Sequence, residues 1–268
     1  MQHALRAALH SNSTLFSLHH LRKLDLSYND FNLSQISSRF GNFSNLTHLN
    51  LNFSGFTGLV PSQISQLSNL VSLDLSLNTK LTLEPIPFNK LVQNLTKLRE
   101  LHLREVDMSL VAPSFLMNLS SPLSSLQLMD CGLQGEFPSE VPGLSNLQLL
   151  DLSGNTDLTG SFPPFNVSNA LSYLDLSKTG ISIHLELDPV NSLKSLTELD
   201  SLDLSGNSYL KLDSSSFNKL VQNLTKLAEL RLRWVNMSLV VPDSFQESVF
   251  FLFNSFFREL WAARETPS

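Results

Sequence analysis

The pattern L-x-x-L-x-L recurs nine times along the 268-residue chain, and this repetition constrains the fold more than any other feature. Successive copies begin 24 to 28 residues apart, at Leu21, Leu46, Leu70, Leu98, Leu123, Leu147, Leu171, Leu199 and Leu227. Side chains alternate between the two faces of a β-strand, so Leu24 and Leu26 point inward while Asp25 points outward. One such strand cannot bury its leucines alone. We therefore expect nine units to stack, to pair their strands in parallel and to share one core.

A turn position follows each strand, three residues after the last leucine of the motif. It is occupied by Asn29, Ser54, Asn78, Val106, Cys131, Asn155, Thr179, Asn207 and Val235. Asparagine at this position can bond neighbouring backbone groups, and stacked copies form a ladder. Valine cannot, so we expect the ladder to be interrupted in repeats four and nine. The spacing is the leucine-rich-repeat signature and predicts an α/β solenoid, a horseshoe with a parallel β-sheet on its concave face and an irregular or short-helical convex side.

A second motif, L-x-G-x-I/V/F-P, follows some strands, at residues 56–61, 133–138 and 158–163. Glycine permits a bend and proline fixes φ, so we expect a short extended segment there. On this motif and on the stretch Leu15–Asn29, the chain resembles the plant-specific leucine-rich repeats of receptor-like kinases, receptor-like proteins and polygalacturonase-inhibiting proteins. The resemblance covers about residues 11–242, and it is strongest to kinase-less receptor-like proteins of the disease-resistance type.

A longer period is also present, because the eleven residues Phe88–Leu98 recur unchanged at Phe217–Leu227, 129 positions later. This offset equals five repeats and indicates a duplicated block. Both copies lie in 28-residue units without the L-x-G-x-I/V/F-P motif. We expect the convex side to be helical or irregular there, with a short helix within Phe88–Leu98 packed on the strand layer.

The two ends of the chain depart from the repeat. We divide the sequence into an incomplete lead-in (1–20), a leucine-rich-repeat domain of about nine repeats (21–242) and a divergent, phenylalanine-rich tail (243–268). The tail either covers the open end of the solenoid or replaces lost repeats, and its apolar run is too short to span a ~30 Å hydrocarbon core. Residues 1–10 lack a signal-peptide pattern, and Cys131 is the single cysteine. Family members normally have a signal peptide and cysteine-paired caps, so this chain is interpreted as an ectodomain fragment.

The glycosylation motif N-x-S/T occurs ten times, more often than composition alone explains, although the repeat itself generates N-L-S/T. The acceptors are Asn12, Asn32, Asn42, Asn45, Asn52, Asn94, Asn118, Asn166, Asn223 and Asn236. This number favours a secretory ancestor. A glycan on Asn52 would cover part of the concave surface.

Catalytic motifs are missing from the sequence: it contains no phosphate-binding loop, nucleophile elbow, metalloprotease motif or kinase motif. A single cysteine and unpaired histidines do not make a zinc site. We therefore expect no enzyme activity and no cofactor. The formal net charge of −6 also argues against nucleic-acid binding.

Binding by the outward positions of the concave sheet is the better-supported use of this scaffold. The aspartate of the L-D-L-S sequences is interpreted as mainly structural, so departures from it are more informative. The candidates for contact with a ligand or partner are His48, Phe53, Arg99, His102, Arg104, Glu105, Arg231, Arg233 and Trp234. Two alternatives remain open: Arg231 pairs with Asp203 across the strands, and Trp234 packs under the tail.

The resemblance implies a non-catalytic recognition module on the extracellular side of the plasma membrane, in defence or development signalling. Its ligand would be a protein, peptide or glycan, and a co-receptor kinase would supply the signal. Three alternatives are a secreted inhibitor of cell-wall-degrading enzymes, an inactive product of a truncated gene, and an intracellular scaffold. The inhibitor would need disulfide-paired caps, and the sequons argue against the scaffold.

Overall fold

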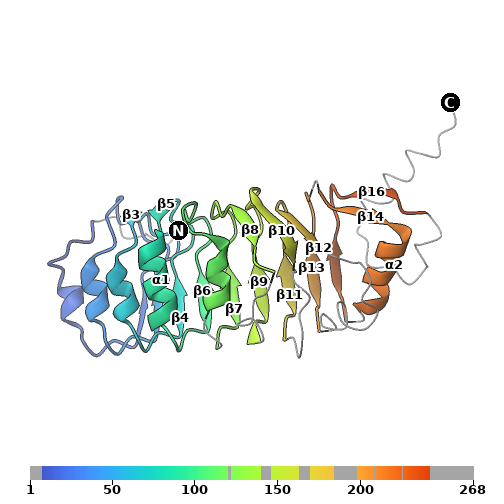
Figure 1. Cartoon of the computed structure of the whole chain (residues 1–268). Helices are drawn as coiled ribbons and strands as arrows, with labels where there is room; N and C mark the ends of the chain where they lie inside the picture. The colour runs from blue at the N-terminus through green and yellow to red at the C-terminus, as the bar shows by residue number, and fades with distance from the viewer. Residues whose placement is uncertain are drawn as a thin grey trace, which may run out of the picture.

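The computed structural model describes residues 8–119, 122–139, 146–162, 170–183, 198–207, 209–224 and 226–241, which form a curved solenoid (Figure 1). One strand from each of the nine units joins a nine-stranded sheet in which every described neighbour is parallel. These strands are β1 (Lys23–Asp25), β2 (His48–Asn50), β4 (Ser72–Asp74), β6 (Glu100–His102), β7 (Ser125–Gln127), β9 (Leu149–Asp151), β11 (Tyr173–Asp175), β13 (Ser201–Asp203) and β15 (Glu229–Arg231). The predicted leucine-rich-repeat solenoid is confirmed.

The register places equivalent residues side by side, so that Leu24 pairs with Leu49 and Leu49 with Leu73. The central leucine of each strand is buried, and together they form a continuous core along the solenoid. In the first repeat Leu24 is buried as expected, whereas Leu26 is only partly buried. The shared core therefore forms because each unit covers the leucines of its neighbour.

A second set of short parallel strands runs along the upper edge in Figure 1. It comprises β3 (Thr57–Leu59) with β5 (Lys80–Thr82), β8 (Gly135–Phe137) with β10 (Leu158–Phe162) and β12 (Gly180–Ile183), and β14 (Lys211–Asp213) with β16 (Asn236–Leu239). The described parts of the three L-x-G-x-I/V/F-P segments are extended, as predicted. Strands β5, β12, β14 and β16 form without that motif, and the sequence analysis did not anticipate them.

Two α-helices occupy the long units, α1 (Pro85–Asn94) and α2 (Ser214–Asn223). Pro85 suits the first turn of α1, where its missing N–H has no intrahelical role. Phe88, Leu91 and Val92 follow helical spacing and are buried. The Asp213 side chain caps α2 by accepting the Ser216 N–H at 2.8 Å. The duplicated segment is therefore helical in both copies, beginning three residues earlier than Phe88 and Phe217.

Shorter 3₁₀-helices take the place of α-helices in other units: η1 (Thr14–Ser17), η2 (Ser38–Asn42), η3 (Ser62–Gln66) and η4 (Pro113–Asn118). Helix η1 belongs to the predicted lead-in, and its Phe16 packs edge-on against Phe40, with ring centroids 5.3 Å apart. The lead-in thus contributes to the core. The phenylalanine-rich tail (243–268) lies outside the described residues.

The side-chain ladder links some neighbouring repeats and skips others. Asn78 Oδ1 accepts the backbone N–H groups of Ser54 and Phe56, and its Nδ2 donates to the carbonyl of Leu51. Asn207 Oδ1 similarly accepts the Thr179 N–H at 2.8 Å. The Val106 side chain has no hydrogen-bonding group, and the Val106 backbone N–H donates to the Leu103 carbonyl within the same repeat. The ladder therefore has gaps at the valine positions, as expected from their side chains.

Candidate ligand-binding face

The last residue of each of the nine strands lies between the two leucines of its L-x-L sequence, and together these residues form one row across the concave sheet, which we call the strand-end row. It runs Asp25, Asn50, Asp74, His102, Gln127, Asp151, Asp175, Asp203 and Arg231. Where the residue is aspartate, its Oδ1 accepts the backbone N–H two positions later, for example at 2.8 Å between Asp175 and Ser177. This local turn is a structural role, as the sequence analysis expected of the L-D-L-S aspartate.

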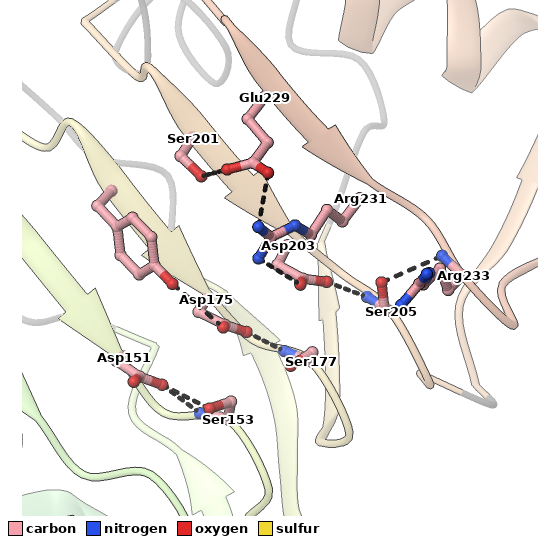
Figure 2. Close-up of polar contacts among 11 residues, drawn as sticks. Asp151, Ser153, Asp175, Ser177, Ser201, Asp203, Ser205, Glu229, Arg231 and Arg233 are labelled. Atoms are coloured by element: carbon pink, nitrogen blue, oxygen red, sulfur yellow. Dashed lines mark hydrogen bonds and ion pairs between the residues drawn. The ribbon is translucent and has the colours of Figure 1, made fainter. Parts of the chain in front are cut away.

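Three carboxylates on adjacent strands, Asp151, Asp175 and Asp203, form an acidic strip (Figure 2). All three are at most 9% exposed. Burial and the charges of the two flanking aspartates raise the pKa of Asp175, although hydrogen bonds from Ser177 oppose them. The Tyr173 hydroxyl donates to Asp175 Oδ2 at 3.4 Å, and burial together with the Asp175 and Asp151 carboxylates raises the pKa of Tyr173 to about 12.

Arg231 ends the acidic strip (Figure 2). Its Nη1 lies 3.6 Å from Asp203 Oδ2, and its Nη2 lies 2.6 Å from Glu229 Oε1. Burial lowers the pKa of Arg231, but the two carboxylates outweigh it and raise the pKa above its ordinary value. The cross-strand pair with Asp203 left open by the sequence is therefore present. The Arg231 side chain is 48% exposed, and such pairs contribute only about 0–1 kcal/mol.

His102 lies between Asp74 and Ser125 on three consecutive strands of the sheet. Its Nε2 is 3.0 Å from Ser125 Oγ, and its Nδ1 is 3.9 Å from Asp74 Oδ2. The residue types match those of a hydrolase triad, but 3.9 Å is too long for a hydrogen bond. The Ser125 backbone N–H already donates to the Arg99 carbonyl at 2.9 Å, so it is not available to an oxyanion. The arrangement fits a polar surface network better than a nucleophilic site.

Two further arginines follow their strands, Arg104 after β6 and Arg233 after β15. Arg104 is half-buried, and its Nη2 approaches Met129 Sδ at 3.5 Å. Arg233 is exposed, and its backbone N–H donates to Ser205 Oγ at 3.1 Å (Figure 2).

Arg99 precedes β6, so this exposed residue lies at the edge where strands begin rather than on the sheet face. His48 is half-buried at the start of β2, with its Nδ1 2.8 Å from Thr47 Oγ1.

The residue before each ladder position has a positive φ in all nine repeats. This left-handed row consists of Tyr28, Phe53, Leu77, Glu105, Asp130, Gly154, Lys178, Gly206 and Trp234. In the first eight repeats its backbone N–H donates to a carbonyl of the next repeat, as from Phe53 to Ser76 at 2.9 Å. These inter-repeat hydrogen bonds hold a conformation that costs non-glycine residues roughly 1–2 kcal/mol.

The left-handed row carries three of the predicted binding residues. Phe53 is 57% exposed and Trp234 is 82% exposed. Tyr28, which the sequence analysis did not select, is 68% exposed and lies 5.7 Å from Phe53 between ring centroids. The signal available in the sequence was its position directly before Asn29. Whether the tail reaches Trp234 concerns residues outside the described part of the chain.

Glu105 lies in a different environment from the other predicted binding residues. It borders a shallow pocket of about 420 Å³, lined by Thr79, Glu105, Asp107, Asp130, Cys131 and Gly132. Hydrogen bonds from Ser109 lower the pKa of Asp107 in this pocket. Within the described ranges, no group of histidine, cysteine, aspartate and glutamate side chains is arranged to hold a metal ion.

Seven predicted glycosylation acceptors are exposed: Asn12, Asn32, Asn42, Asn45, Asn94, Asn118 and Asn236. Asn52 is half-buried on the concave side. Asn45 Nδ2 donates to the His19 carbonyl at 3.2 Å, a bond that a glycan would have to accommodate. Asn166 and the side chain of Asn223 lie outside the described residues. Among the helices that are described, none combines the length and apolar character needed to cross a membrane.

Comparison with known proteins supports the repeat assignment. The family model for the Leucine Rich Repeat matches residues 20–43 and 45–67. Receptor-like protein Cf-9 of Solanum pimpinellifolium is 43% identical over 179 residues, which are 67% of this chain and 20% of the relative. Receptor-like protein 6 of Arabidopsis thaliana is 38% identical over 206 residues, 75% of this chain and 20% of the relative. The chain thus spans about a fifth of the length of these curated relatives.

Solved structures agree on the fold. The Arabidopsis receptor kinase HAESA, in complex with the peptide hormone IDA and the co-receptor SERK1, gives a TM-score of 0.65 at 27% identity, covering 86% of this chain and 36% of HAESA. A Leptospira interrogans leucine-rich-repeat protein gives a TM-score of 0.61 at 24% identity, covering 86% of this chain and 58% of that one. The chain therefore belongs to the leucine-rich-repeat proteins, and over two thirds of its length it is similar to plant receptor-like proteins.

Proposed function

We propose that this chain is a recognition module that captures a peptide or protein ligand on its concave face and carries out no catalysis itself. The observation that carries the proposal is the in-register sheet, whose leucines are committed to the core while alternate side chains face outward. Outward residues can therefore vary without disturbing the fold. The departures from the repeat at His102, Arg104, Arg231, Arg233 and Trp234 are such residues.

The similarity to plant receptor-like proteins supports an ectodomain role on the extracellular side of the plasma membrane. The exposed glycosylation acceptors are consistent with passage through the secretory pathway. HAESA was solved with a peptide hormone and a co-receptor. By analogy, this module would present a peptide or protein ligand to a co-receptor kinase in defence or development signalling.

The test is a binding measurement on the glycosylated protein secreted from plant cells. Peptides enriched from a displayed random library would be measured against wild type and the double variant Arg233→Ala/Trp234→Ala. We expect at least a tenfold loss of affinity, because exposed arginine and tryptophan are the residue types that anchor interfaces. Unchanged affinity would remove both residues from the binding face.

The matched control is Lys90→Ala/Met117→Ala, which also removes one cation and one large apolar side chain. Both residues are exposed, on α1 and η4, outside the nine-stranded sheet. The control should bind like wild type. Equal losses in both double variants would indicate nonspecific adhesion and contradict recognition by the concave face.

A further inference from the structure

Arg104 is held firmly between repeats three and four by its backbone. Its N–H donates to Ser76 Oγ at 3.2 Å, and its carbonyl accepts the Leu77 N–H at 2.7 Å. The side chain then extends toward repeat five, where Nη2 meets Met129 Sδ at 3.5 Å. The backbone bonds fix the position of the Arg104 backbone, and the Met129 contact places the guanidinium beside repeat five.

The guanidinium of Arg104 has no counter-charge within the described part of the chain. Its Nε is shielded from solvent and has no hydrogen-bond partner there. Its Nη2 contacts a thioether, which is only a weak acceptor. No described carboxylate oxygen lies within 4.0 Å of it. A partly desolvated cation without an acceptor is unfavourable unless something else supplies the negative charge.

In the second copy of the duplicated unit, carboxylates of the chain itself compensate the charge of an arginine. His102 and Arg104 correspond to Arg231 and Arg233, 129 positions later. In that copy, Asp203 and Glu229 neutralise Arg231, and Arg233 is solvent-exposed. In the first copy the facing carboxylate, Asp74, lies beside His102 and not beside Arg104. The two copies thus share an eleven-residue sequence and the same kinds of strand and helix, but they differ in charge compensation.

The immediate neighbours of Arg104 on the sheet are uncharged. Ser76 and Met129 occupy the same position in the adjacent repeats, and Gln127 follows His102 in the strand-end row. Glu105 is adjacent in sequence, but it borders the rim pocket with Asp107 and Asp130. An anionic group placed over Arg104 would therefore meet a cation flanked by neutral side chains.

We propose that Arg104 binds the carboxylate of a glutamate side chain in an extended peptide lying across repeats four and five. The carboxylate would accept hydrogen bonds from the two Nη groups, because Nε is enclosed, and paired N–H donors match the two oxygens of a carboxylate. The Met129 thioether lies where it can pack against the glutamate methylenes. This inference rests on the proposed function, because it names the chemistry that the concave face selects.

The direct test follows the Nε–H resonance of Arg104 by ¹⁵N NMR, with assignment by its loss in Arg104→Met. The probes are two peptides, acetyl-Ala-Ala-Glu-Ala-Ala-amide and its glutamine counterpart, titrated at constant ionic strength. The glutamate peptide should shift the Arg104 resonance and bind about tenfold more tightly than the glutamine peptide, since hydrogen bonds between charged groups are the stronger kind. Equal binding of the two peptides, or no shift of this resonance up to millimolar concentrations, would overturn the proposal.

A stability measurement separates a binding arginine from a structural one. Without peptide, Arg104→Met should leave the melting temperature unchanged or raise it, because an uncompensated cation is replaced by an apolar chain of similar length. A structural arginine would instead give a clear drop. Arg22→Met, an exposed cation before β1, controls for the loss of one charge, and Arg104→Gln checks that the result does not depend on methionine.

The result can be distinguished from a failure of the proposed function. Library-selected peptides that need Arg233 and Trp234 but tolerate Arg104→Met would retain concave-face recognition and remove only the Arg104 subsite. Loss of glutamate-peptide binding in Arg104→Met, with wild-type binding in Arg22→Met, would support the subsite by itself.

Discussion

The side-chain Oδ1 of Asn155 accepts the backbone N–H of Cys131 at 3.0 Å, although the two residues belong to different repeats. The same oxygen accepts the Leu133 N–H, and Nδ2 donates to the carbonyls of Leu128 and Leu152. With the Ser153 carbonyl, which Nδ2 also meets at 3.4 Å, one amide therefore bonds five backbone groups in two neighbouring repeats. It connects units that otherwise interact through the sheet and the shared leucines.

Replacing Asn155 with alanine should lower the free energy of unfolding by about 2–4 kcal/mol, because several buried backbone groups lose their partners. The measurement is urea denaturation followed by far-UV circular dichroism. Asn69→Ala is the control, since Asn69 lies outside the core and makes only solvent-exposed hydrogen bonds, donating to the Ser44 carbonyl at 3.0 Å and accepting from Lys97 Nζ at 2.8 Å. A loss below about 1 kcal/mol at Asn155 would contradict a ladder that joins the repeats.

Asp74 and Asp175 occupy the same position in their repeats, but their pKa values move in opposite directions. Burial raises the pKa of Asp74, yet the adjacent His102 and hydrogen bonds from Ser76 outweigh it and lower the pKa below 3.8. At Asp175, burial and the flanking Asp203 and Asp151 carboxylates dominate and raise the pKa. The residue at the same position of the next strand therefore decides whether the charged form of the aspartate is favoured or disfavoured.

Asparagine substitution should consequently have opposite effects at these two positions. Asp74→Asn should destabilise the protein at pH 7, and the deficit should disappear as the pH falls through the lowered pKa of Asp74. Asp175→Asn should stabilise the protein at pH 7, because a disfavoured charge is removed, and the gain should vanish below the unfolded pKa of about 3.8. Urea denaturation of both variants between pH 3 and 7 checks the signs. Effects of the same sign would contradict the assigned causes.

The repeat architecture could be predicted because the leucines recur at regular spacing along the sequence. Because successive side chains of a strand point to opposite faces, Leu24 is buried when Asp25 faces outward. Each unit also needs a neighbour to cover its core. The helical segments at Phe88 and Phe217 followed from their 28-residue units without the L-x-G-x-I/V/F-P motif, which predicted a helical or irregular convex side. The strands β5, β12, β14 and β16 could not be inferred in the same way, because their pairing depends on the adjacent repeat rather than on a local motif.

The binding face was only partly predictable for a similar reason. The sequence identified Arg104 and Arg231 as departures from the repeat and left a pair between Arg231 and Asp203 open. It could not reveal that Arg231 is neutralised while Arg104 has no described counter-charge. That difference arises from rotamers and from residues one repeat away. Tyr28 was missed because the position before Asn29 was not treated as exposed, although Phe53 and Trp234 were selected at the same position of their repeats; the left-handed backbone that exposes all three is visible only in the structure.

Cys131 should be unreactive in the folded protein. Burial raises the pKa of its thiol to about 12, and Sγ donates to the Leu103 carbonyl at 3.0 Å. Since the thiolate is the reactive species, iodoacetamide at pH 8 should not label the native chain over hours but should label it fully in 6 M guanidinium. Mass spectrometry measures the labelled fraction. Rapid stoichiometric labelling without denaturant would contradict the burial of the Cys131 thiol at the turn position of repeat five.

Gly154 should tolerate alanine poorly, for two separable reasons. Its φ of +76° is unfavourable for a residue with a Cβ, and that Cβ would collide with the Asp130 carboxylate. We expect Gly154→Ala to cost about 2–4 kcal/mol, the sum of left-handed strain and the displaced carboxylate. Gly206→Ala isolates the first contribution, because φ is +73° there and the nearest atom, 3.0 Å away, belongs to the flexible Lys178 side chain. Asp130→Ala combined with Gly154→Ala should reduce the cost to that of Gly206→Ala. If the double variant were as unstable as Gly154→Ala alone, the collision with Asp130 would not be the cause.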